Sequence, residues 1–115
     1  MATDASTLYK LIILYMLDRV NSPMTNAQIS EFVLEKGYTT YFTLQEVLNT
    51  LISDGFITEE SYHSSTHYTI TDSGRETINF FKYKISSSIV SDINLFLSDN
   101  KYELKEAVNN ISEYY

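Results

Sequence analysis

The sequence predicts a mainly α-helical fold that carries one small β-hairpin. Apolar residues recur at intervals of three and four in the first half of the chain, and two Thr-x-x-Gln/Glu motifs there mark helix starts. Farther along, the run His67–Thr71 alternates ring or aliphatic side chains with threonine, which is typical of a β-strand. With 115 residues, the chain has the length of one domain.

The composition is that of a globular protein. Hydrophobic residues make up 43% of the chain and charged residues 20%, and ten Tyr and six Phe supply bulk for a packed core. The absence of cysteine excludes disulfides, thiolate metal sites and a cysteine nucleophile. The longest apolar run, Leu11–Leu17, is too short to span a membrane, and Met1–Leu8 lacks the basic start of a secretory signal. We therefore expect a cytoplasmic protein.

The first predicted helix runs from Thr7 to Val20 and ends at Asn21-Ser22-Pro23, since proline disfavours helical geometry in the residue before it. This helix is apolar on more than one side. Such a helix lies deep in a core or is shared with a second chain, and a domain this small has little depth. The pattern therefore favours burial in a dimer.

Two capped helices are predicted to follow. Thr25-Asn26-Ala27-Gln28 is a capping box, and Gly37 stands where a left-handed helix end is expected. A second capping box, Thr43-Leu44-Gln45-Glu46, begins a third helix that Asp54-Gly55 closes. The apolar pairs positioned to staple these two helix starts are Met24 with Ile29 and Phe42 with Val47.

The hairpin is predicted to follow the third helix directly. Phe56–Tyr62 and His67–Thr71 are the two strands, joined by a turn over His63–Thr66. Asp72-Ser73-Gly74 then begins a helix that extends toward Leu97, with Ser86–Ser88 as an interruption. A last amphipathic segment carries Leu104, Ala107, Val108 and Ile111.

This order of elements is that of a winged helix-turn-helix followed by a C-terminal helical extension, and two motifs resemble the PadR and MarR regulators. Leu48-x-x-Leu51-x-x-x-Gly55-x-Ile57 is similar to the end of their recognition helix. Tyr68-Thr69-Ile70-Thr71-x-x-Gly74 is similar to the close of their wing, with Ile70 in place of the usual leucine.

The resemblance covers Leu8 to about Ile93. It implies a transcriptional regulator that is a homodimer held by its first and last helices, with the third helix presented to the major groove of double-stranded DNA. We expect an uncharacterised bacterial family within that superfamily, whose members continue into a further C-terminal region. In this interpretation residues 1–80 form the winged-helix domain, and residues 81–115 form the extension used for dimerisation.

The candidate DNA-binding residues follow from the apolar stripe of the third helix, which leaves its polar residues facing outward. Gln45 and Asn49 offer amides to an adenine edge, and Thr43 and Thr50 suit phosphate or a thymine methyl group. The alternative without a binding function is that these are solvated polar residues on an exposed helix. The full candidate set is Lys36, Tyr41, Thr43, Gln45, Glu46, Asn49, Thr50, Ser53, His63 and Arg75.

The charge of the chain opposes DNA binding. The formal net charge is −7, and no Lys or Arg occurs from Tyr38 through Ile70, although phosphate contacts normally supply much of the affinity for DNA. Lys36 and Arg75 flank this stretch, and helix N-termini can also donate amides to phosphate. The charge pattern favours a second hypothesis, a winged-helix module that binds a basic protein partner in place of DNA.

Neither catalysis nor a cofactor is predicted. The sequence holds no Gly-x-Ser-x-Gly elbow, phosphate-binding glycine loop or His-Glu-x-x-His motif. His63 and His67 lie four apart in a hairpin, where they are better explained as exposed residues than as metal ligands. An aromatic stripe is expected to be core, with an effector pocket as the alternative; it comprises Tyr9, Tyr15, Phe32, Phe80, Phe81 and Phe96.

Overall fold

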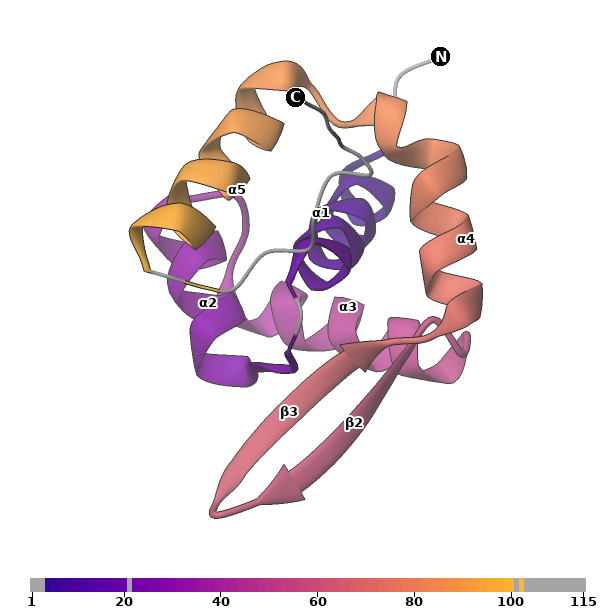
Figure 1. Cartoon of the computed structure of the whole chain (residues 1–115), viewed down its shortest axis with the longest axis vertical. Coiled ribbons are helices and arrows are strands. Elements are labelled where there is room, and N and C mark those ends of the chain that lie inside the picture. Colours follow the sequence, from indigo (N-terminus) through magenta and orange to yellow (C-terminus); the bar gives the residue numbers. More distant parts are fainter. Residues whose placement is uncertain (1–3, 21, 101, 103–115) are drawn as a thin grey trace, which may run out of the picture.

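A computed structural model describes residues 4–20, 22–100 and 102, and it is mainly helical with a three-stranded antiparallel sheet (Figure 1). This confirms the predicted class of a helical fold with a small hairpin. Within the described part of the chain, every helix is too short or too polar to cross a bilayer. The elements are α1 (Ala5–Arg19), β1 (Met24–Thr25), α2 (Asn26–Glu35), α3 (Tyr41–Ser53), β2 (Ile57–Tyr62), β3 (Ser65–Ile70), α4 (Asp72–Phe81), the 3-10 helix η1 (Lys82–Lys84) and α5 (Ser87–Asp99).

Helix α1 lies at the centre of the molecule, with the other helices arranged around it (Figure 1). It begins after Asp4, whose carboxylate accepts a hydrogen bond of 2.8 Å from the amide of Thr7. Six of its apolar side chains are at most 3% exposed within a single chain: Leu11, Ile12, Ile13, Leu14, Met16 and Leu17. Of the two alternatives that the sequence left open for this helix, the core of its own chain therefore buries these side chains, because α3, α4 and β3 of the same chain cover it.

The sheet has the strand order β1-β3-β2. Met24 of β1 lies opposite Tyr68 of β3, and Ile57 of β2 lies opposite Ile70. The predicted turn over residues 63–66 was too long: β2 and β3 are joined by His63 and Ser64 alone, with φ values of 54° and 63°. Two residues at positive φ make the tight turn that suits twisted strands, but His and Ser carry none of the usual Asn-Gly signal.

The capping box at Thr25 is confirmed, since its hydroxyl accepts from the Gln28 amide at 3.1 Å and Gln28 Oε1 accepts from the Thr25 amide at 2.9 Å. The box predicted at Thr43 was wrong. Thr40 caps α3 instead, and its hydroxyl accepts from the Thr43 amide at 3.2 Å. Phe42 is 84% exposed, so it forms no apolar staple with the core. Two threonines three residues apart offer the same capping chemistry, and the earlier one begins the helix.

The left-handed helix ends are also confirmed, because Gly37 has φ +71° and Gly55 has φ +81°. The predicted long helix after residue 72 is divided into α4 and α5, and the hydroxyl of Ser86 caps α5 by accepting from the Ile89 amide at 3.3 Å. The expected interruption at the serine run is thus confirmed. The last predicted amphipathic segment, with Leu104, Ala107, Val108 and Ile111, lies outside the described residues.

Helix α5 belongs to the same hydrophobic core as the rest of the chain. Ile93 and Leu97 are fully buried, and the rings of Phe96 and Phe32 are 5.0 Å apart, centre to centre. The hydroxyl of Tyr38, after α2, donates to Asp92 of α5 at 3.0 Å. The described chain as far as α5 therefore shares one hydrophobic core, which the expected division into residues 1–80 and 81–115 does not describe.

Gly74 allows the start of α4 to dock against the link between α3 and β2. A Cβ atom at this position would overlap the carbonyl oxygen of Phe56 and lie 2.9 Å from Cγ1 of Ile70. Thr71, which caps α4, donates from its hydroxyl to Gly55 O at 2.7 Å and from its amide to Phe56 O at 3.0 Å. The missing side chain of Gly74 and the two hydrogen bonds of Thr71 thus both hold the start of α4 against the α3–β2 link.

We predict that Gly74→Ala lowers the free energy of unfolding by about 1–3 kcal/mol, the usual cost of overpacking. Ser73→Ala is the matched control, since Ser73 is an exposed neighbour on the same helical turn and its loss should change stability by less than about 0.5 kcal/mol. Urea denaturation followed by circular dichroism measures both. Equal stability of the two variants would contradict the close approach of α4 to Phe56.

Candidate functional site

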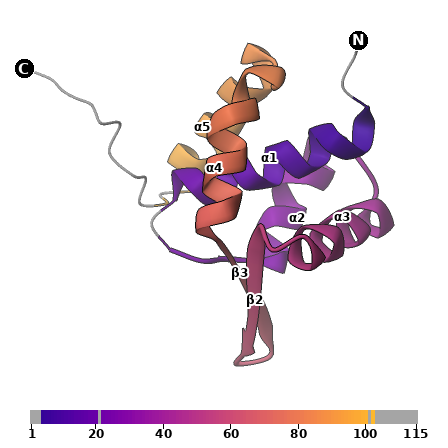
Figure 2. The same cartoon turned by 90° about the vertical axis from the view of Figure 1, so that its right-hand side faces the viewer.

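A polar groove of about 610 Å³ runs between the start of α2, one side of α3 and the hairpin. Figure 2 shows the hairpin projecting from the helical body next to α3. The groove therefore lies between the projecting hairpin and the adjacent helix α3. It is lined by Thr25, Asn26, Ala27, Ser30, Tyr41, Gln45, Asn49, Glu59, Ser64, Ser65, Thr66 and Tyr68.

Asn26, the first residue of α2, is the centre of a hydrogen-bond network in this groove. Its Nδ2 donates to Gln45 Oε1 at 2.9 Å and to the Tyr68 hydroxyl at 3.0 Å. Its Oδ1 accepts from Gln45 Nε2 at 3.3 Å and from the Ser30 hydroxyl at 3.2 Å. An asparagine side chain has two donor hydrogens and two acceptor lone pairs, so all of its bonding capacity is used. One residue thereby ties α2 to α3 and to β3.

Tyr68 is the member of this network that comes from the hairpin, and its side chain is 4% exposed. Burial is the main cause that raises the pKa of Tyr68; the Asn26 hydrogen bond lowers it, and the charges of Glu59 and Tyr41 raise it further. The phenol therefore keeps its proton at neutral pH. The neutral hydroxyl is the acceptor of the hydrogen bond from the Asn26 amide.

Gln45, predicted on the flank of the third helix with an amide available to an adenine edge, uses that amide within the protein. It is half-buried, and both ends of its amide are bound to the amide of Asn26. The start of α3 at Tyr41 and the saturated partner at Asn26 explain the difference, because both depend on how α2 and α3 are packed. A free amide edge for an adenine base is therefore not offered by Gln45.

The outer face of α3 carries the remaining predicted residues. Glu46, Asn49 and Ser53 are exposed, whereas Thr50 is half-buried and its hydroxyl donates to the carbonyl of Glu46 at 3.0 Å. Asn49 thus presents the exposed amide of this helix. At the start of the helix, Tyr41 is 54% exposed and lines the groove. Thr43, close by, is half-buried and its hydroxyl accepts from that of Thr40 at 3.1 Å.

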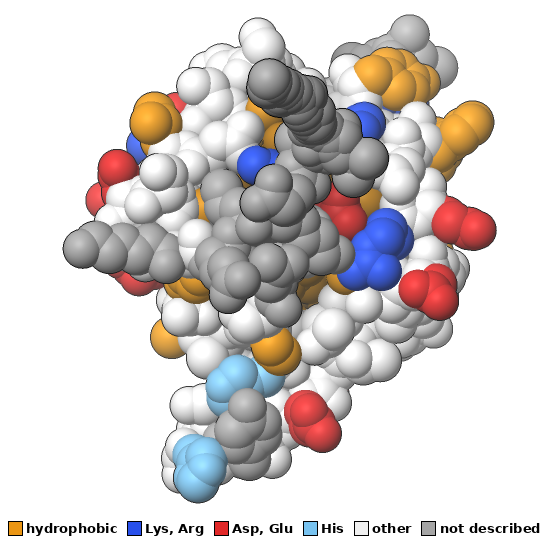
Figure 3. Space-filling view, in the orientation of Figure 1, with side chains coloured by type: hydrophobic (Ala, Val, Ile, Leu, Met, Phe, Trp, Pro, Cys, Tyr) orange, Lys and Arg blue, Asp and Glu red, His pale blue; other side chains and the backbone are white. Residues whose placement is uncertain are grey.

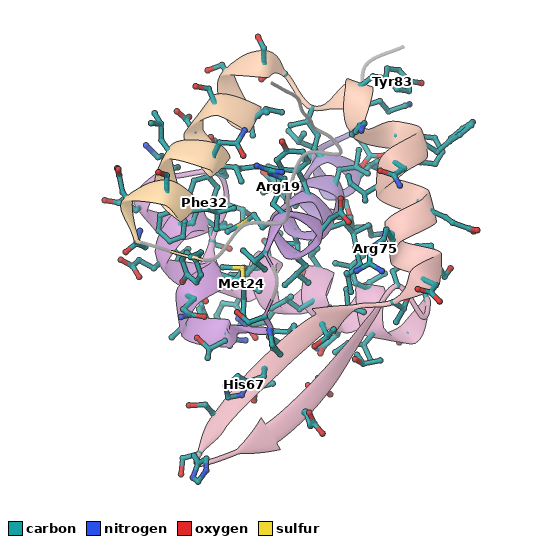
Figure 4. All side chains as sticks on the ribbon, in the orientation of Figure 1. Arg19, Met24, Phe32, His67, Arg75 and Tyr83 are labelled. Atoms are coloured by element: carbon teal, nitrogen blue, oxygen red, sulfur yellow. The ribbon has the colours of Figure 1, made fainter. Side chains whose placement is uncertain are left out.

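Lys36, His63 and Arg75, the other three predicted residues, lie apart from one another. Lys36 is exposed at the end of α2, and His63 is exposed in the hairpin turn. Arg75 points from α4 toward α1 (Figure 4), where its Nε lies 3.2 Å from a carboxylate oxygen of Asp18; its Nη1 lies 3.5 Å from Asp72. The guanidinium is thus engaged between two helices and is not directed at the groove.

The surface around the groove is acidic. Glu46, Glu59 and Glu60 are exposed on α3 and β2, and no Lys or Arg occurs from Tyr38 through Ile70. In Figure 3 the projecting hairpin carries histidine and acidic side chains, while the blue of Lys and Arg lies over the helices. Among the described residues, no group of His, Asp and Glu is placed to hold a metal ion. The site therefore offers amides, hydroxyls and carboxylates to a partner.

The sequence analysis missed Asn26 and Tyr68. Asn26 was seen only as part of a capping box, and Tyr68 only as part of a strand and a motif. The available signal was that Tyr68, between His67 and Thr69, lies in a predicted strand with alternating side chains, where a buried hydroxyl needs a hydrogen-bond partner.

The family described as a domain of unknown function (DUF4364) matches residues 9–115. The chain belongs to this family. No curated protein and no solved structure matches it. The match takes in every described element except the first turn of α1, so the groove and its network belong to the region that defines this DUF4364 domain.

We predict that Gln45→Ala lowers the free energy of unfolding by about 0.5–1.5 kcal/mol, because it removes two of the four hydrogen bonds of the half-buried Asn26 amide. Asn49→Ala, one helical turn away and exposed, should change it by less than about 0.5 kcal/mol. Chemical denaturation of both variants measures the difference. A Gln45→Ala variant as stable as the parent would contradict the network.

Proposed function

We propose that this DUF4364 chain is a winged helix-turn-helix protein that binds duplex DNA and regulates transcription in the cytoplasm. The observation that carries the proposal is the exposed polar face of α3 beside a projecting hairpin. The element order α1-β1-α2-α3-β2-β3 and the strand order β1-β3-β2 support it. In such an arrangement the second helix of the pair, here α3, enters the major groove, and the hairpin is the wing.

Asn49 is proposed as the main base-reading residue. Asparagine pairs through two hydrogen bonds with the major-groove edge of adenine, and Asn49 is exposed on α3. The carboxylate of Glu46, one turn earlier on the same face, accepts hydrogen bonds and so suits the amino group of cytosine. Gln45 is assigned a supporting role, because its amide is bound to Asn26.

The charge distribution sets the expected strength of binding. Each phosphate neutralised by a basic side chain contributes about −0.9 to the slope of log K against log salt concentration. Lys36 is the exposed cation near α3 in the sequence, while Arg75 is engaged with Asp18. We therefore expect weak binding with a slope no steeper than about −3.

The test is fluorescence anisotropy with labelled DNA from the region upstream of the gene, measured between about 50 and 200 mM salt. Asn49→Ala should weaken binding to the preferred sequence by ~1–3 kcal/mol, which is roughly five- to 160-fold. Asn79→Ala, the same change at an exposed position of α4, should leave the affinity unchanged. Absence of binding at the lowest salt, or equal losses for both variants, would reject the DNA proposal.

A second candidate function is a docking module for a basic protein segment. The exposed carboxylates of Glu46, Glu59 and Glu60, together with a Phe42 ring that is 84% exposed, favour it. Glu60→Gln separates the two functions, because removing this exposed charge, to which no base contact is assigned, should strengthen binding to DNA and weaken binding to a basic partner. The same anisotropy titration, repeated with a labelled lysine-rich peptide, gives both readings.

The regulator is further proposed to be a homodimer that pairs through η1 and α5. Tyr83 and Leu95 are 74% and 59% exposed, and both line an open groove beside these helices. Light scattering should therefore give a dimer, and the double variant Tyr83→Ser/Leu95→Ser should be monomeric. Leu34→Ser, at a position 40% exposed on α2, is the control and should remain dimeric. A parent protein that is monomeric at every concentration would rule out the dimer.

A further inference from the structure

A second cleft lies on the other side of α3, away from the polar groove. Its volume is about 250 Å³, and it is enclosed by α1, the end of α3, the α3–β2 link and α4 with η1. The floor is apolar: Leu11 and Leu14 come from α1, Leu51 from α3, and the rings of Phe56 and Phe81 close the sides. A surface opening with such a floor suits the apolar part of a small molecule.

The rim of this cleft is basic, although the protein as a whole is strongly acidic. Lys10 of α1 and Lys84 of η1 both line it, and they are two of the eight basic residues in a chain of net charge −7. The Lys84 ammonium lies 5.7 Å from the centre of the Phe81 ring, within the range of a cation–π contact. That contact holds a positive charge beside an apolar wall.

Neither ammonium group is used by an acidic residue of the described chain. The ion pairs among the described residues are those of Arg75, with Asp18 and with Asp72. The pKa of Asp4 is lowered mainly by its hydrogen bond from the Thr7 amide. The positive charge of Lys10 lowers the pKa of Asp4 further, as a smaller cause. No carboxylate of the described residues forms an ion pair with Lys10, so its ammonium group is available to an anion from outside.

We propose that this cleft binds a small monocarboxylate with a short aliphatic chain, its carboxylate held by Lys10 and Lys84 and its chain lying on the leucine floor. At roughly 30 Å³ for each water-sized group, 250 Å³ accommodates about eight such groups. Hexanoate has this size. The carboxylate supplies the negative charge that complements the two ammonium groups on the rim.

The position of the cleft couples such a ligand to the proposed DNA-binding elements. Leu51 lies in the last turn of α3, and Phe56 joins α3 to β2. A ligand in contact with these residues packs against α3 on the side opposite to Asn49. The binding proposal itself does not depend on DNA binding, so either one can fail alone.

The test is a titration of the full chain with sodium hexanoate, followed by methyl chemical shifts of leucine. Shifts should concentrate at Leu11, Leu14 and Leu51, and hexanamide, the neutral analogue, should bind about tenfold more weakly because the charge-assisted hydrogen bonds are lost. Acetate, which has the same headgroup without the chain, should also bind more weakly. Equal binding of hexanoate and hexanamide, or no saturable shift with hexanoate, would overturn the proposal.

The variants Lys10→Gln and Lys84→Gln should each weaken hexanoate binding about five- to tenfold without changing the melting temperature of the free protein. Lys82→Gln is the matched control, because Lys82 lies in the same 3-10 helix, is exposed and does not line the cleft. Lys84→Arg should retain most of the affinity. A loss at Lys82 equal to that at Lys84 would show that only general surface charge attracts the anion, and it would reject this site.

Discussion

The burial of α1 is the constraint on which the rest of this structure depends. Consecutive positions from Leu11 to Leu14 are at most 3% exposed, so the helix needs cover on several sides at once. A chain of 115 residues provides that cover only by wrapping its other helices and the base of the hairpin around this one helix. The outward surfaces of α3 and the hairpin are then what remains available for a partner.

The polar groove shows how that outward surface is held in place. Asn26 uses all four of its hydrogen bonds within the protein, and it binds one residue from α3 and one from the hairpin. A saturated network of this kind rigidifies the angle between two elements, and leaving it half-satisfied would cost more than omitting it. The network therefore has a structural purpose even though its residues line a surface groove.

The surface charge differs between the polar groove and the apolar cleft. The side with Glu46, Glu59 and Glu60 repels phosphate, so any DNA binding must depend on shape, amides and helix ends more than on charge. The cleft with Lys10 and Lys84 is the converse, a small basic rim around an apolar floor. Both sites contact α3, from opposite sides, so α3 is the element that the proposed anion site and the proposed partner site share.

What the sequence by itself determined is local. The capping box at Thr25, the left-handed ends at Gly37 and Gly55, and the serine break before α5 all follow from hydrogen bonds and backbone preferences within a few residues. Three other features were settled only by the three-dimensional packing: the inward turn of Gln45, the pairing of the two-residue strand β1 with β3, and the coverage of α1 by its own chain. Each of these depends on partners distant in the sequence. Neither the spacing of apolar residues nor a local motif predicts which distant residue will donate a hydrogen bond to a given side chain or cover its apolar surface.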